Sequence, residues 1–219
     1  SKLEQGAELL NLLGTSNYSF NEFKSELQKI GTTISFSSDK NYFMINVKGF
    51  DKYFDESIQY VNEFISNVKG DDKKIKILAD NAKSSRKMEA EDTPKIGRAL
   101  RDYVNFGDKS YYLRRLTLDE IKKTKSADYI TSFKNALNYE LSILYSGRPN
   151  MEAIESSIKE NLTLSENPIN SDSPASANLV VNKRDKNTIF LVDDKEAVQS
   201  QIYFLSSGSI INEENRAAS

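Results

Sequence analysis

AELLNLLGTSNYSFNEFKSELQKIGTTISFSSDKNYFMINVKGF, residues 7–50, carries the clearest structural signals in the chain. The cluster Gly14–Asn17 breaks a first helix. Ser19, with Glu22 three residues later, forms a capping box, which predicts the start of a second helix. The apolar residues of that helix recur at helical spacing, and Gly31 supplies the glycine at which helices commonly end.

Two strands are predicted after this helix. Thr33–Phe36 and Tyr42–Val47 are rich in β-branched and aromatic residues, and the short polar turn Ser37–Asn41 separates them. In the second strand apolar and more polar residues alternate, so one face of the strand is expected to be buried. The stretch therefore predicts a helix packed on an antiparallel hairpin.

Helical and strand patterns continue through the rest of the chain. Further helices are predicted over residues 2–13, 50–68, 73–90, 93–106, 126–137 and 151–162, with a short one starting at the capping box of Thr117 and Glu120. Further strands are predicted over 139–145, 188–192 and 199–205. The fold class is α+β: an antiparallel β-sheet of four or more strands, with helices packed mainly on one face.

Composition excludes several kinds of chemistry. The 219 residues include no cysteine and no histidine, which removes thiolate zinc sites, disulfides, cysteine catalysis and histidine-based triads. The net charge of −2 gives no electrostatic reason to expect nucleic acid or an anionic membrane as a partner. No apolar run reaches the roughly 18 residues that would predict a membrane span.

The order of these motifs resembles the pitrilysin/insulinase/mitochondrial processing peptidase family of zinc peptidases. The resemblance begins with LLGTSNYSF and the hairpin after it, and extends through DKYFDESIQYVNEFISNV, RRLTLDEIKK and LSILYSGRP, covering residues 7–149. It implies a metallopeptidase-like module of the processing-peptidase type. Each motif alone is short, and their shared order and spacing carry the resemblance.

Catalytic members of that family carry the zinc motif His-x-x-Glu-His nine residues ahead of the Gly-Thr turn. Here that place holds Gln5-Gly6-Ala7-Glu8-Leu9, in which only Glu8 matches. The motif binds zinc because two histidines four residues apart share one helix face. Asp80 and Glu89 fall where the family places its third ligand, but neither is assigned a metal. We therefore predict no catalytic, cofactor-binding or metal residues in this chain, and zinc only in a parent enzyme.

Two other groups of polar residues have a functional and a plain interpretation. The first is a group of tyrosines and arginines in a connecting segment. It could contact a peptide carboxylate or nucleic acid, or its rings could pack on the core while its arginines contact surface carboxylates. The second is a set of scattered carboxylates, which could act in glycoside hydrolysis only if they lined a cleft, or could simply be solvated on the surface. The plain interpretation is preferred for both. The groups are Tyr111, Tyr112, Arg114 and Arg115, and Glu140, Glu152 and Glu155.

Three regions are predicted: a non-catalytic peptidase-like α+β module at 1–163, a Ser/Asn/Pro-rich linker at 164–178, and the first strands of a following module at 179–219. Val192-Asp193 and the run 198–202 (VQSQI) resemble the family's entry into its next module. We expect the chain to be an excised piece of a longer polypeptide, so the absence of a targeting signal carries little information.

The predicted role is that of a non-catalytic wall of the peptide-enclosing chamber in a zinc metalloendopeptidase, with no activity by this chain alone. The alternatives are a non-catalytic scaffold or peptide-binding subunit that pairs with a catalytic partner, and an unrelated helix-and-sheet binding domain. Expected partners are other modules or a catalytic subunit, the peptide substrate, and a second copy through strand edges at 188–205; nucleic acid and membrane are not expected. The compartment is unknown, although the resemblance favours the bacterial periplasm.

Overall fold

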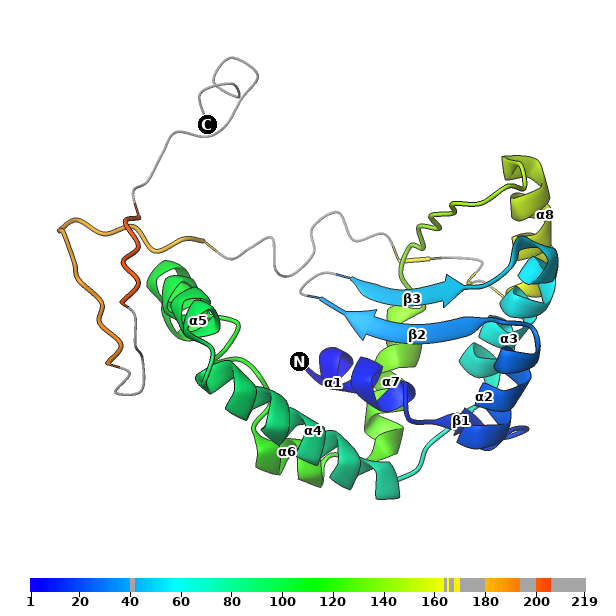
Figure 1. Ribbon diagram of the computed structural model, residues 1–219, viewed down its shortest axis with the longest axis horizontal. Coiled ribbons are helices and arrows are strands. Elements are labelled where there is room, and N and C mark those ends of the chain that lie inside the picture. The colour runs from blue at the N-terminus through cyan, green and yellow to red at the C-terminus, as the bar shows by residue number, and fades with distance from the viewer. Residues whose placement is uncertain (40–41, 164, 166–167, 170–179, 194–199, 206–219) are drawn as a thin grey trace, which may run out of the picture. The chain divides into compact units, whose positions relative to one another are not determined.

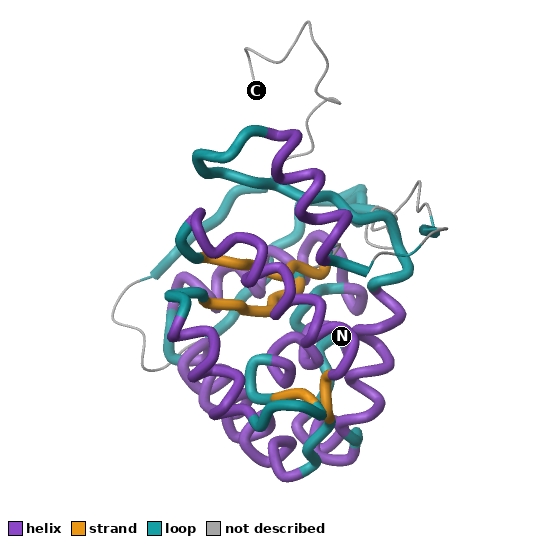
Figure 2. Tube along the Cα trace, turned by 90° about the vertical axis from the view of Figure 1, so that its right-hand side faces the viewer, coloured by secondary structure: helices purple, strands orange, loops and turns teal. Residues whose placement is uncertain are grey.

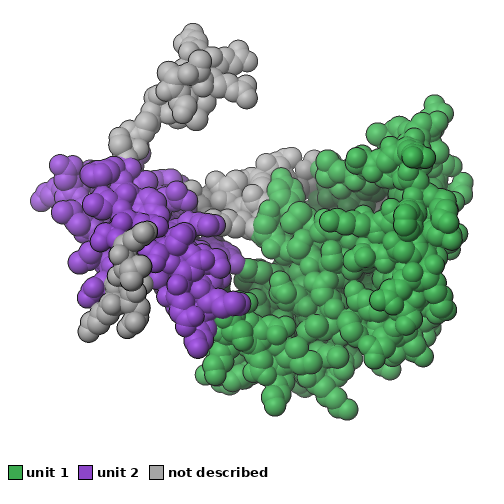
Figure 3. Space-filling model, viewed as in Figure 1, with its two compact units in different colours: residues 1–85, 115–178 green, residues 86–114, 179–219 purple. Residues whose placement is uncertain are grey.

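The computed structural model describes residues 1–39, 42–163, 165, 168–169, 180–193 and 200–205. The chain divides into two compact units, residues 1–85 with 115–178 and residues 86–114 with 179–219 (Figure 3). The three regions predicted from the sequence stay a prediction. The elements, in chain order, are α1 (Lys2–Leu10), β1 (Gly14–Thr15), α2 (Phe20–Lys29), β2 (Thr33–Ser38), β3 (Phe43–Lys48), η1 (Asp51–Tyr53), α3 (Phe54–Asn67), β4 (Val68–Lys69), α4 (Lys73–Ala90), α5 (Thr93–Phe106), η2 (Gly107–Lys109), α6 (Leu118–Lys123), α7 (Ser126–Ala136) and α8 (Met151–Asn161).

The helix boundaries follow the caps expected from the sequence. At the start of α2 the Glu22 amide donates to Ser19 Oγ, and the Ser19 amide donates to Glu22 Oε2 at 2.8 Å, so the capping box is confirmed. Gly31 has a φ of +63°, a conformation that favours glycine, directly after α2. Thr117 and Glu120 form the same box ahead of α6, and Asn150 caps α8. These capping side chains accept hydrogen bonds from backbone amides of the first helical turn that would otherwise have no partner.

Strands β2 and β3 form the predicted antiparallel hairpin, in register from Thr33 opposite Lys48 to Ser38 opposite Phe43 (Figure 1). Ile34 and Phe36 point into the core of the first unit. The Phe36 ring lies 4.6 Å from that of Phe64 on α3 and 6.0 Å from that of Phe133 on α7, measured between centroids. Alternation buries Ile34 and Phe36 of β2, whereas in β3 Phe43 and Ile45 are half-buried and Val47 is exposed, so the buried face expected for the second strand is formed only in part.

Helix α1 packs against α7 and β2. The two helices lie close at Gly6, where a Cβ would be in van der Waals contact with the carbonyl oxygen of Tyr129 at 3.4 Å. At the edge of β2, the Asn11 amide nitrogen donates to the Phe36 carbonyl at 2.8 Å, and the Phe36 amide donates to Asn11 Oδ1 at 2.9 Å. Asn11 thus pairs with the backbone of β2 as a neighbouring strand would.

The predicted sheet of four or more strands is wrong for the described residues. They form two separate two-stranded ladders, β1 with β4 and β2 with β3 (Figure 2). Residues 139–145, predicted as a strand, make one bridge from Tyr139 to Ile169, and Leu144 is 95% exposed. Residues 188–192 and 200–205 also carry no strand, and residue 199 lies outside the described residues. These segments have β-type sequences but no continuous backbone partner, and a strand needs one.

The second unit is built around α5. Gly107 ends the helix with a φ of +56°, and two residues from much later in the chain, Asn182 and Arg184, contact its C-terminal end. The Asn182 amide donates to the Asn105 carbonyl at 2.7 Å, and Arg184 donates to the Val104 carbonyl at 2.8 Å. The returning chain thereby satisfies carbonyls at the C-terminal end of α5, where a positive charge is also favourable.

Candidate functional site

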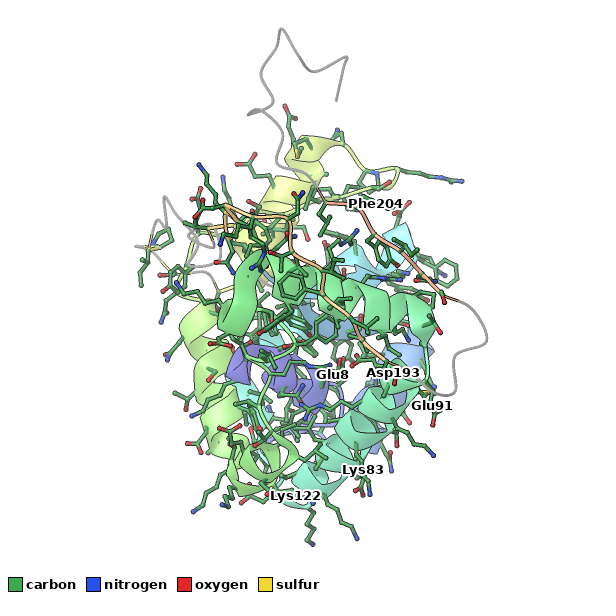
Figure 4. The ribbon with its side chains drawn as sticks, turned by 90° about the vertical axis from the view of Figure 1, so that its left-hand side faces the viewer. Glu8, Lys83, Glu91, Lys122, Asp193 and Phe204 are labelled. Atoms are coloured by element: carbon green, nitrogen blue, oxygen red, sulfur yellow. The ribbon has the colours of Figure 1, made fainter. Side chains whose placement is uncertain are left out.

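The place of the family's zinc motif lies on α1 in the first unit. Glu8 is exposed to solvent (Figure 4), whereas Leu9 is fully buried in the core. Gln5 is half-buried, and its Oε1 has no hydrogen-bond partner. The two positions that hold histidine in catalytic members are thus a core leucine and a partly buried amide. Neither side chain is a zinc ligand of the usual type.

The other predicted acidic positions are far apart on α4. Asp80 is exposed and Glu89 is half-buried. They are separated by nine residues, or roughly 14 Å of helix rise, which is too far to share one metal ion. Among the described residues, no group of three or more Asp, Glu, His or Cys side chains could hold a metal. The prediction that this chain has no metal or catalytic residue stays a prediction.

The tyrosine and arginine segment does not assemble a binding site. The rings of Tyr111 and Tyr112 are half-buried and pack edge to face, with centroids 5.4 Å apart. The Tyr111 amide donates to Asp102 on α5, which fixes the segment to its own unit. Arg114 is exposed. The two rings pack on each other, and the interpretation that they pack on the core stays a prediction.

The scattered carboxylates also lie on solvated surfaces. Glu140, Glu152 and Glu155 are all exposed. Glu155 Oε1 accepts from Lys159 Nζ at 2.6 Å one turn along α8, and this hydrogen bond lowers the pKa of Glu155. An exposed pair of this spacing contributes little to stability and has no catalytic geometry.

Sequence patterns did not reveal a polar cluster centred on Glu63 of α3. Its Oε1 accepts from Thr15 Oγ1 at 2.6 Å, and its two oxygens accept from Asn17 Nδ2 at 3.0 and 3.1 Å. Asn67 Nδ2 adds a further hydrogen bond to Oε2 at 2.6 Å. The cluster joins the turn after α1 to the end of α3, across 46 to 48 residues of sequence. A separation of this size leaves no periodic signal, so only the structure could identify it.

The described residues also line a small hollow of about 130 Å³ between the start of α3 and α8. Its two carboxylates are both engaged. Asp51 accepts from Tyr145 Oη at 2.9 Å and from the Arg148 amide at 3.3 Å, and Asp55 accepts from Ser157 Oγ. Burial, with the Asp51 hydrogen bond second, raises the pKa of Tyr145. Hydrogen bonds to Asp51 at this hollow hold the 145–148 turn in place, and both lining carboxylates already accept hydrogen bonds.

Comparison with sequence-family models finds no match, and comparison with curated proteins finds none either. Solved structures do match. A ferredoxin protease, FusC, in complex with Arabidopsis ferredoxin aligns over 83% of this chain with a TM-score of 0.63 and 10% identity. The periplasmic protease PqqL from Escherichia coli aligns over 84% with a TM-score of 0.60 and 14% identity. A protease from Helicobacter pylori aligns over 84% with a TM-score of 0.55 and 16% identity.

This chain shares its fold with part of each protease. It spans 20% of the first two and 45% of the third. Identities of this size concern the fold alone, because one fold serves many functions and function depends on the site. Among the described residues, no helix is both long and apolar enough to cross a membrane.

Proposed function

We propose that this chain is a non-catalytic portion of a zinc peptidase of the insulinase/pitrilysin type. Its helices and hairpin form part of the wall of a chamber that encloses the peptide substrate, and the chain has no activity by itself. The observation that carries the proposal is the replacement of the zinc motif by Gln5 and a fully buried Leu9 within a fold shared with proteases. The proposed partners are further modules of the same polypeptide or a separate catalytic subunit.

In such an enzyme the chemistry belongs to the other half. Zinc held by histidines there would supply an activated water molecule for hydrolysis of the peptide bond. This chain supplies rigid packing: α1, α7 and the hairpin share one core, so they hold a fixed surface toward the substrate. A fixed wall limits the size and conformation of peptides that can enter.

A second function is favoured by the same observation. A scaffold or peptide-binding subunit of this fold also needs no zinc ligands, and it would pair with a catalytic partner rather than belong to the same polypeptide. Neither nucleic acid nor a membrane is a proposed partner, since the net charge is −2. The bacterial periplasm is the proposed compartment.

The deciding experiment measures zinc content and peptide cleavage for this chain and for a longer polypeptide that contains it, each with and without a chelator. We expect the chain to be metal-free and inactive, and the longer polypeptide to cleave peptides until the chelator is added. If the longer polypeptide is also inert and metal-free, the scaffold function replaces the first proposal. Stoichiometric zinc and cleavage by this chain alone contradict both.

A further inference from the structure

The β2–β3 hairpin has one closed edge and one open edge. On the β2 side, the Asn11 side chain bonds to both the amide and the carbonyl of Phe36, so these two groups point away from β3. In an antiparallel ladder, a residue that does not exchange hydrogen bonds with the residue opposite leaves both of them pointing outward. Phe36 lies opposite Ile45. The amide and carbonyl of Ile45 therefore point to the outer edge of β3, as do those of Phe43 and Val47 two residues to either side.

This outer edge has no partner in the part of the chain that the structure describes. The backbone groups of Phe43, Ile45 and Val47 make no hydrogen bond with any described residue. The turn supports the assignment, because the Asp39 amide donates to the Tyr42 carbonyl at 3.0 Å, which fits the same alternation along the ladder. A row of unpaired amides and carbonyls is a template for a further strand.

A second extended backbone without a partner lies in the same unit, on the side of β3 away from β2 (Figure 1). It is segment 139–145, which connects α7 to the turn before α8. Residues 141–145 make no backbone hydrogen bond with any described residue. The side chains of Leu141 and Ile143 are 53% and 49% exposed. Both backbones therefore have groups available for pairing.

Contacts at its two ends show that this segment runs in the same direction as β3. It follows α7, whose Phe133 packs on Phe43 at the start of β3 with ring centroids 5.1 Å apart. It ends at Tyr145, whose hydroxyl donates to Asp51 at 2.9 Å, shortly after the end of β3. The Tyr145 ring also packs edge to face on Phe54 at the start of α3. The segment and β3 thus run the same way, without hydrogen bonds between them.

A single strand between β3 and the segment would use the free groups of both. If it runs antiparallel to β3 it is also antiparallel to the segment, so both pairings are of the same type. With β2, this makes an antiparallel sheet of four strands in the first unit. Side chains at alternate positions of the added strand would face the helices and cover Ile45 and Val47, of which Val47 is 37% exposed.

The strand that fits this position must have both of its own edges free. In a second copy of the chain, β3 already pairs with β2 and could use only one edge. Such a contact would bury less than the roughly 1,200 Å² of stable interfaces and would leave segment 139–145 unpaired. A short separate peptide loses translational and rotational freedom on binding, whereas a covalently linked strand is held at a high effective concentration. These arguments favour a linked strand.

We propose that an extended segment of a longer polypeptide, outside the 219 residues, pairs as a strand antiparallel to β3 and to segment 139–145. The inference rests on the proposed function in one respect, that this chain is part of a longer polypeptide. The strand carries apolar residues at alternate positions, toward Ile45 and Val47, and more polar residues between them.

Hydrogen exchange measured at single amides tests the pairing. In the 219-residue chain, the Ile45 amide points to the open edge and should exchange quickly, whereas the Asn46 amide points to β2 and should be protected. In the longer polypeptide, the Ile45 amide should exchange at least about tenfold more slowly than in the 219-residue chain, at every protein concentration. The Asn46 amide is the internal control and should change little.

The absence of cysteine from the chain permits a second measurement. A strand between β3 and the segment would hold Ile45 and Ile143 roughly 9–10 Å apart, because neighbouring strands are about 4.8 Å apart. A disulfide spans Cα atoms separated by less than about 7 Å. The variant Ile45→Cys with Ile143→Cys in the longer polypeptide should therefore stay unlinked on mild oxidation. Ser35→Cys with Asn46→Cys, which lie opposite each other in the hairpin, is the positive control.

The other results overturn the inference. Fast exchange of the Ile45 amide in both proteins means that the edge stays open. Slow exchange in the 219-residue chain means that the edge already has a partner there, and a disulfide between positions 45 and 143 identifies the segment as that partner. Protection that appears only at high concentration comes from a second molecule. Zinc content and cleavage are separate readouts: an inert, metal-free longer polypeptide removes the peptidase proposal, but protection of Ile45 in it still supports the added strand.

Discussion

At the scale of single residues, the position most informative about function is Leu9. In the resemblance found in the sequence it falls where catalytic relatives carry a zinc-binding histidine, and it is fully buried, as are Tyr129 and Phe133 of α7. The face of α1 that carries Leu9 is part of the hydrophobic core. A metal site would need the same face to open toward a water-filled cleft.

Introducing two histidines on this helix should therefore fail to create a zinc site. The double substitution Gln5→His and Leu9→His places an imidazole in an apolar core, which should lower the free energy of unfolding by about 2–4 kcal/mol. Urea unfolding measures the loss, and calorimetric titration with zinc measures binding. Glu8→Gln, at an exposed neighbour, should change stability by less than about 0.5 kcal/mol. Tight zinc binding by a stable double variant would contradict this account of α1.

Glu63 is the residue whose role the sequence concealed. Glu63→Ala removes the acceptor of Thr15, Asn17 and Asn67, and should destabilise the chain by about 1–3 kcal/mol because the hydroxyl of the buried Thr15 and two side-chain amides lose their partner. Chemical denaturation followed by fluorescence of the tyrosines measures this loss. Glu56→Ala, exposed on the same helix, is the matched control and should be nearly neutral. If Glu63→Ala and Glu56→Ala change the free energy of unfolding equally, the cluster does not contribute to stability.

At the scale of elements, features set by interactions within a few residues could be predicted from the sequence, and features set by distant residues could not. Capping boxes, Gly31 and Gly107 act within a few residues, so the sequence located the helices closely. The strand at 139–145 was predicted from YELSILY, yet its extended backbone finds one bridge partner among the described residues. The residues of a segment show whether it can form a strand, but whether it pairs depends on a partner strand that lies elsewhere in the sequence. The Glu63 cluster escaped prediction for the same reason.

The capping carboxylates should make stability depend on acid pH. Hydrogen bonds from the Ser126 side chain and amide lower the pKa of Asp72, and bonds from the Thr117 amide and hydroxyl lower the pKa of Glu120. A pKa lower in the folded than in the unfolded chain gives stability that is present above the unfolded value. It is lost as pH falls through that value, about 4, and below. Urea midpoints measured from neutral to acid pH should therefore fall.

Asp72→Asn isolates one of these contributions. The amide cannot gain or lose a proton in this range, so the variant should be less stable at neutral pH and should show a shallower loss toward acid than the unaltered chain. Asp80→Asn, at an exposed position of the same helix, is the control. An unchanged acid slope in the Asp72 variant would show that the Ser126 bonds do not contribute.

At the scale of the whole molecule, burial differs sharply between the units. Every buried apolar side chain among the described residues lies in the first unit. In the second unit, Gly97 and Ser110 are the buried residues that the structure describes. A few rings and backbone bonds therefore hold residues 180–193 against α5, and local opening should need little free energy.

Hydrogen exchange should show this difference directly. Amides of α1, α7 and β2 lie in the dense core and should exchange slowly, whereas amides of 188–193 and 200–205 should exchange within the fastest class at low protein concentration. Slow exchange of 188–193 would contradict this account, because it would mean that the backbone of the segment already has a partner.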